Sequence, residues 1–139
     1  MIEAPTQPKL PKWLLLIVVP GALLLAAGAI IALINPAMLA SPGIAINGAV
    51  HVYAGYLVAR NLALAVLLLV TLSMGARSSL STLMVLTALI QFFDAAMDMM
   101  EGRWQLIPGV VVFAVVFLFG AARITGAPIW RAAAWRDAS

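Results

Sequence analysis

Cysteine is missing from this chain of 139 residues, and charged residues and histidine are scarce. The absence of cysteine excludes disulfides, thiolate nucleophiles and cysteine-ligated metals. Charged residues make up only 9% of the chain and hydrophobic residues 65%, whereas a soluble domain carries about 25% charged residues. Together with a mean hydropathy of +1.11, this composition excludes an ordinary soluble domain and predicts an integral membrane protein.

Four apolar stretches have the length needed to cross a bilayer as helices, which is about 20 residues. They cover residues 13–34, 49–72, 80–100 and 104–124, between a polar tail at 1–12 and a second tail at 125–139. The first stretch follows two lysines, as a signal peptide would, but it is longer than a usual signal-peptide core and is expected to be a retained helix. The predicted fold is all-α, an antiparallel four-helix transmembrane bundle.

Basic residues beside the predicted spans indicate the orientation, because cytoplasmic loops carry an excess of lysine and arginine. Seven of the eight basic residues lie near the ends of the predicted spans, and Arg103 is the single one on the side opposite the termini. The two tails and the second loop carry the other six: Lys9, Lys12, Arg77, Arg123, Arg131 and Arg136. We therefore expect both termini to be cytoplasmic. The expected location is a bacterial inner membrane. The basic residues are expected to contact lipid head groups rather than nucleic acid, and the C-terminal tail, with Trp130 and Trp135, to be an interfacial anchor.

A polar stripe runs along the third predicted span. At about 100° per residue, its members fall within an arc of roughly 80°: Thr87, Gln91, Asp94, Asp98 and Glu101. A carboxylate at bilayer depth costs several kcal/mol, so this face must meet a partner or a wet cavity. The stripe therefore marks the candidate functional site.

The second span also has a polar face, on which Tyr53, Tyr56 and Arg60 lie within about 60°, with Asn61 beside them. The predicted topology places Arg60 about 18 Å and Asp94 about 12 Å below the same surface. Because helical side chains lean toward the N-terminus of their own helix, Arg60 should reach Asp94. We expect an outward-opening pocket between these two helices. The loop 35–48 is expected to be a plain connector, although it is long enough to form a lid.

The residue types in this pocket favour general acid–base chemistry. Two carboxylates one helical turn apart disfavour simultaneous ionisation, so Asp94 and Asp98 would form an acid–base pair while Arg60 keeps one of them ionised. A carboxylate at Asp98 would still need a donor. The remaining polar residues are expected to bind substrate: Tyr53, Tyr56, Asn61, Gln91 and Glu101. Such a site suits epoxide opening, isomerisation or cyclisation of a lipophilic small molecule. Its residue types resemble those of limonene-epoxide-hydrolase-type enzymes, although the fold of those enzymes is different.

Two other interpretations stay open. The same buried carboxylates would suit a small transporter or proton-coupled carrier. The protein could equally be a non-catalytic membrane subunit in which Arg60 and Asp94 form only a structural pair.

No cofactor or metal is expected, because the single histidine, His51, lies about 160° around the helix from Tyr53 and no second ligand has suitable spacing. Haem ligation through His51 is the one alternative. The first span offers small surfaces at Gly21, Ala22, Gly28 and Ala29 where another helix can approach closely. These surfaces would also permit a homo-oligomer.

Three short strings carry a resemblance to a known family. VARNLALAVLLL, LTALIQFFDAAMD and EGR resemble the arginine of helix two and the aspartate of helix three in DoxX-like proteins, small four-helix bacterial membrane proteins. The resemblance covers about residues 34–124. It implies the four-helix fold and a role for Arg60, Asn61, Asp94 and Asp98, but it implies no particular activity, and Tyr53 and Tyr56 are not part of the pattern.

Overall fold

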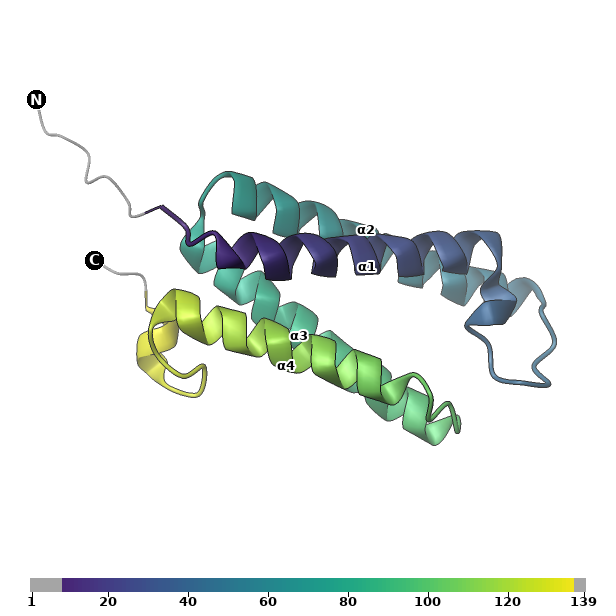
Figure 1. Cartoon of the computed structure of the whole chain (residues 1–139). Coiled ribbons are helices and arrows are strands. Elements are labelled where there is room, and N and C mark those ends of the chain that lie inside the picture. The colour runs from purple at the N-terminus through teal and green to yellow at the C-terminus, as the bar shows by residue number, and fades with distance from the viewer. Residues whose placement is uncertain (1–8, 137–139) are drawn as a thin grey trace, which may run out of the picture.

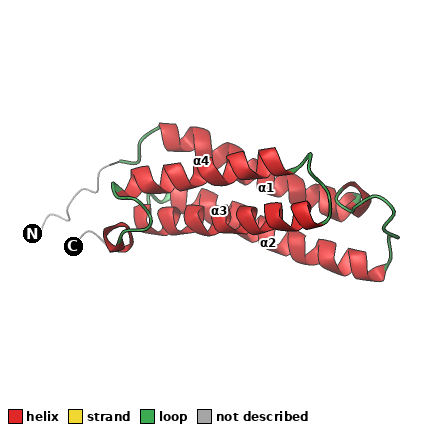
Figure 2. Ribbon diagram, turned by 90° about the horizontal axis from the view of Figure 1, so that it is seen from below, coloured by secondary structure: helices red, strands yellow, loops and turns green. Residues whose placement is uncertain are grey.

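The computed structural model describes residues 9–136 and is all-helical over that range. Its four long helices are α1 (Trp13–Ile34), α2 (Gly48–Ser73), α3 (Arg77–Met100) and α4 (Ile107–Thr125), with short 3-10 helices η1 (Pro36–Met38) and η2 (Ala132–Trp135). All four long helices are long and apolar enough to cross a membrane. All four lie lengthwise in the molecule (Figure 2). The predicted antiparallel four-helix bundle is therefore confirmed.

Local sequence signals explain where α2 and α4 begin. The Asn47 side chain accepts a hydrogen bond from the Val50 backbone N–H and caps α2. Two helices differ from the predicted spans. α3 begins at Arg77 rather than near residue 80, which shortens the second loop. α4 begins at Ile107 rather than 104, which places Pro108 in the first turn, where a backbone N–H would have no partner within the helix.

The helices form two hairpins, α1 with α2 and α3 with α4, and contacts within each hairpin are more extensive than those between them. The hairpins converge at the end where α1 begins and diverge toward the α1–α2 loop (Figure 1). The largest fully buried side chains include Leu14, Val18, Leu68, Leu80 and Phe117. They come from the start of α1 and α3 and the end of α2 and α4, so the solid core fills the converging half of the bundle.

Small residues allow the close approach of α1 to its neighbours. Ala22 and Ala29 are buried, and Gly21 lies against the ring of Phe117 in α4. The small surfaces predicted on α1 are thus used within the chain. Because lipid tails are as apolar as leucine, this packing rather than the hydrophobic effect holds the helices together. Large apolar side chains on the outer faces stay exposed, such as Leu16, Leu33 and Phe93, as expected for surfaces that face lipid.

Gly21→Ala should destabilise the protein by about 1–3 kcal/mol through overpacking, because a Cβ at this position would lie 2.3 Å from Phe117 Cζ. Gly55→Ala is the matched control, since a Cβ there meets nothing within 4 Å. Removing a helical glycine should make that variant neutral or more stable by up to about 1 kcal/mol. Thermal unfolding in mild detergent measures both changes. Equal stability of the two variants would contradict the close contact.

Candidate functional site

A cavity of about 580 Å3 lies between the two hairpins, in the half of the bundle where they diverge. All four long helices line it, together with the α1–α2 loop and the α3–α4 turn. Most of its wall is apolar, including Leu24 and Leu25 of α1 and Phe113 of α4. Its polar lining residues are Tyr53, Arg60, Asn61, Gln91, Asp94, Asp98 and Arg103. The cavity is thus an apolar chamber with one cluster of polar and charged groups.

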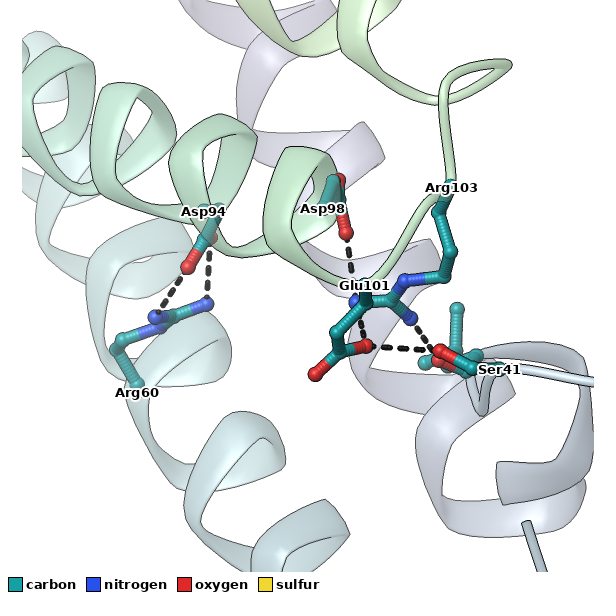
Figure 3. A network of polar contacts seen from close by, with 7 residues as sticks. Ser41, Arg60, Asp94, Asp98, Glu101 and Arg103 are labelled. Carbon is teal, nitrogen blue, oxygen red and sulfur yellow. Dashed lines mark hydrogen bonds and ion pairs between the residues drawn. The ribbon is translucent and has the colours of Figure 1, made fainter.

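Arg60 of α2 and Asp94 of α3 form a bidentate ion pair at the cavity wall (Figure 3). Arg60 Nη1 donates to Asp94 Oδ1 at 3.0 Å, and Nη2 donates to Oδ2 at 2.9 Å. Arg60 Nε donates to Asn61 Oδ1 at 3.2 Å. The predicted pair is therefore confirmed, and its two parallel bonds match a carboxylate anion in a geometry that lysine could not reproduce.

Asp98 pairs with a second arginine, Arg103, which also contacts Glu101. Its Oδ1 lies 2.6 Å from Nη2 of Arg103, and the same nitrogen lies 3.1 Å from Oε2 of Glu101. Asp98 is almost fully buried, so the donor that an ionised Asp98 requires comes from the α3–α4 turn. Sequence reasoning placed Arg103 in that turn but did not assign it to the site.

A glycine cap explains how Arg103 reaches Asp98. Gly102 adopts a left-handed conformation with φ +73°, and the Arg103 backbone N–H donates to the Asp98 carbonyl at 2.8 Å. This is the Schellman arrangement, in which the chain turns back over the last turn of the helix. The string Glu101-Gly102-Arg103 at the end of an apolar helix was the available sequence signal, because a C-terminal glycine predicts such a cap.

The α1–α2 loop is bonded to the same turn. Arg103 Nη1 donates to the carbonyl of Leu39, and Ser41 Oγ donates to Glu101 Oε2 at 3.0 Å (Figure 3). Pro36, Leu39 and Ala40 of this segment line the cavity. The expectation of a plain connector is therefore wrong, because the loop joins the two hairpins and forms part of the chamber.

The other predicted site residues divide into two groups. Tyr53, Asn61 and Gln91 line the cavity, whereas Tyr56 and Glu101 do not. The lining face of α2 is centred about 40° beyond Tyr53, and Tyr56 lies about 100° from that centre. Exposure does not separate the two tyrosines, because Tyr53 is 74% and Tyr56 71% exposed, so it is the rotation of α2 that decides which of them lines the cavity. Glu101 lies one residue beyond the end of α3, at the rim, where it bonds Arg103 and Ser41.

Two further residues lie apart from the cavity lining. Thr87, the first member of the predicted stripe, is fully buried, and its hydroxyl donates to the Leu83 carbonyl at 2.8 Å. His51 is exposed in the first turns of α2. The members of the stripe that line the cavity are therefore Gln91, Asp94 and Asp98.

The charges of this cluster do not balance. It holds three carboxylates, from Asp94, Asp98 and Glu101, and two guanidinium groups, from Arg60 and Arg103. Asp98 and Glu101 share one guanidinium, so a proton held by either of them would neutralise the cluster. Excess charge is costly in a region of low dielectric constant. The cluster therefore has one carboxylate more than it has guanidinium groups.

Comparison with protein-family models, curated proteins and solved structures finds no match to this chain. The resemblance to DoxX-like proteins thus stays a prediction.

Proposed function

We propose that this protein is an integral membrane enzyme that performs general acid–base chemistry on a lipophilic small molecule. The observation that supports this function most directly is the position of Asp94 and Asp98, each paired with an arginine, in the wall of an otherwise apolar cavity. A volume of about 580 Å3 lies in the range typical of small-molecule sites. We further propose that both termini are cytoplasmic, from the distribution of basic residues, and that the membrane is a bacterial inner membrane, from the resemblance to DoxX-like proteins.

The two aspartates have different roles in this proposal. Arg60 donates to both oxygens of Asp94, the bidentate geometry of an arginine–carboxylate pair, and Asp94 is the proton acceptor in this proposal. Asp98 shares the guanidinium of Arg103 with Glu101, so one guanidinium faces two carboxylates. Asp98 is therefore the proton donor in this proposal. In epoxide opening, Asp98 would protonate the epoxide oxygen while Asp94 accepts a proton from the attacking water, so that the product is a diol. Isomerisation or cyclisation would use the same donor and acceptor.

The first test asks whether a lipophilic compound occupies the cavity. The protein is purified in mild detergent and extracted, and bound compounds are identified by mass spectrometry. Ala54→Trp adds a large side chain to the cavity wall, whereas Ala59→Trp places it on the opposite face of α2, away from the lining residues. We expect a compound in the wild type and in Ala59→Trp that is lost from Ala54→Trp. An Asp94→Asn variant tests whether the polar cluster contributes to retention.

Equal retention by the two tryptophan variants would contradict binding in the cavity. A wild type that yields no compound beyond bulk lipid and detergent would favour a structural role for the Arg60–Asp94 pair.

A proton-coupled carrier is the second candidate. It is favoured by the arrangement of two hairpins with a cavity between them, because rocking of one hairpin against the other would expose the site alternately. In proteoliposomes, a pH gradient would then drive flux of the extracted compound without chemical change. Conversion of the compound without such flux would favour the enzyme.

A further inference from the structure

A second groove lies at the opposite end of the molecule, beside the last turns of α4. It has a volume of about 700 Å3. Val115, Leu118 and Phe119 of α4 form one wall, and Pro128, Ile129 and Trp130 of the C-terminal tail form the other. Figure 1 shows the yellow tail folded back beside the end of α4. The groove is separate from the site proposed for catalysis, which lies near the start of α4.

Specific hydrogen bonds hold the tail in this position. Gly126 turns the chain with φ +69°, Thr125 Oγ1 donates to the Ala127 carbonyl at 2.9 Å, and Trp135 Nε1 donates to the Ile129 carbonyl at 2.7 Å. The groove is therefore formed by the fold of the tail and not by the α4 surface alone.

Arg123 is the one charged residue that lines the groove. Its guanidinium carbon lies 4.9 Å from the centre of the Phe119 ring, a cation–π contact. Among residues 9–136, the three carboxylates lie at the C-terminal end of α3, at the other end of the bundle. The groove end carries Lys9, Lys12, Arg77, Arg123, Arg131 and Arg136. The charge of Arg123 is thus not neutralised by a described acidic side chain.

Two carbonyl groups in the last turn of α4 accept hydrogen bonds from donors outside the helix. Arg77 Nη2 donates to the Ile124 carbonyl at 3.3 Å, and the Gly126 N–H donates to the Ala122 carbonyl at 3.0 Å. These contacts reduce the negative potential that a helix C-terminus otherwise presents. They also bring a second cation, Arg77, close to the end of the helix.

We propose that this groove binds one anionic phospholipid of the surrounding membrane. The phosphate contacts Arg123, in the last turn of a membrane-crossing helix, and an acyl chain lies along Val115 and Phe119, which are about half exposed. Trp130, 83% exposed, lies at head-group level, where tryptophan is enriched in membrane proteins. Apolar walls and a cation in one groove match a lipid better than a free anion, which would not use the walls.

The test uses the full chain in detergent with defined lipid, followed by native mass spectrometry. Phosphatidylglycerol is the anionic probe and phosphatidylcholine the zwitterionic one. We expect the wild type to retain phosphatidylglycerol in preference, and Arg123→Gln to reduce that retention by about tenfold, as for loss of a hydrogen bond to a charged group. Arg136→Gln removes the same charge at the same end but outside the groove, so it should change retention by no more than about threefold.

Three results would overturn the proposal. Equal losses in the two arginine variants would indicate diffuse attraction to a basic surface. Equal retention of the two lipids would exclude recognition of the anionic head group. Competition by inorganic phosphate as effective as by phosphatidylglycerol would assign the site to a free anion. If Arg123→Gln does not fold, Val115→Trp, which narrows the groove without changing charge, should also reduce retention, and unchanged retention would contradict the site.

Discussion

Asp94→Leu is expected to lower the free energy of unfolding by about 3 kcal/mol, the cost of an unpaired arginine within a membrane-spanning helix. Arg60 lies about 18 Å along α2 from Gly48, and its partner in the cavity is Asp94. A leucine at residue 94 removes both acceptors and leaves the guanidinium charged, because arginine is not deprotonated in proteins. Unfolding in mixed micelles by titration with a denaturing detergent measures the loss.

Arg60→Leu provides the comparison. It leaves a carboxyl group that can become neutral by taking up a proton, so its effect should be smaller than that of Asp94→Leu. The double variant Arg60→Leu/Asp94→Leu removes both charges and should be more stable than Asp94→Leu alone. Such non-additivity is the sign of a direct interaction. Single-variant effects that simply add in the double variant would show that the ion pair contributes nothing to stability.

The double variant also separates the structural and functional interpretations of this pair. If it folds and still retains the cavity compound, Arg60 and Asp94 only join α2 to α3. Loss of the compound from a folded double variant would place the pair in the binding site.

The second large effect concerns turnover. Asp98→Asn should reduce the turnover of the compound class recovered from the cavity by about 10²- to 10⁴-fold, the usual contribution of a positioned general acid or base. Asparagine nearly preserves the shape of the side chain and can still accept a hydrogen bond from Arg103, but it cannot exchange a proton. The compound should therefore still bind. Turnover at saturating substrate, the Michaelis constant and the unfolding temperature are measured together.

Asp137→Asn is the matched control for this substitution. It makes the same chemical change in the C-terminal tail, outside the described residues, and should leave turnover unchanged. Glu101→Gln should cause a smaller loss than Asp98→Asn, because Glu101 lies at the rim and affects the site through Arg103. If folded Asp98→Asn turns over substrate at the wild-type rate, Asp98 is not the proton-transferring group.

Much of the candidate site could be predicted because the membrane imposes strict conditions. A span of about 20 apolar residues must be a helix, since its backbone polar groups have no other partner in lipid. Helical periodicity then places Asp94 and Asp98 on one face, and the span lengths place Arg60 near the depth of Asp94. Because both charges must be neutralised at that depth, their pairing followed from the sequence.

The role of Arg103 was not predicted, because it depends on how the chain turns after α3. Its contact with Asp98 requires the left-handed Gly102 and the backbone bond between Arg103 and Asp98. Its bond to Leu39 joins residues from different hairpins, and no local pattern relates them. Tyr56 was predicted to line the pocket because it lies on the polar face of α2. It does not line the cavity, because packing against α1 and α3 sets the rotation of α2 relative to the cavity.

The sequence by itself determined that this protein has four membrane-crossing helices, a carboxylate face on α3 and an arginine on α2 able to meet it. These properties follow from composition, span length and helical periodicity, which are local. Only the tertiary structure decided that the hairpins pack closely at one end, where Gly21 meets Phe117, and diverge at the other to leave a cavity that Arg103 and the α1–α2 loop border. The reason is physical: helix rotation and divergence depend on which side chains of distant segments fit together, and that fit exists only in the packed bundle.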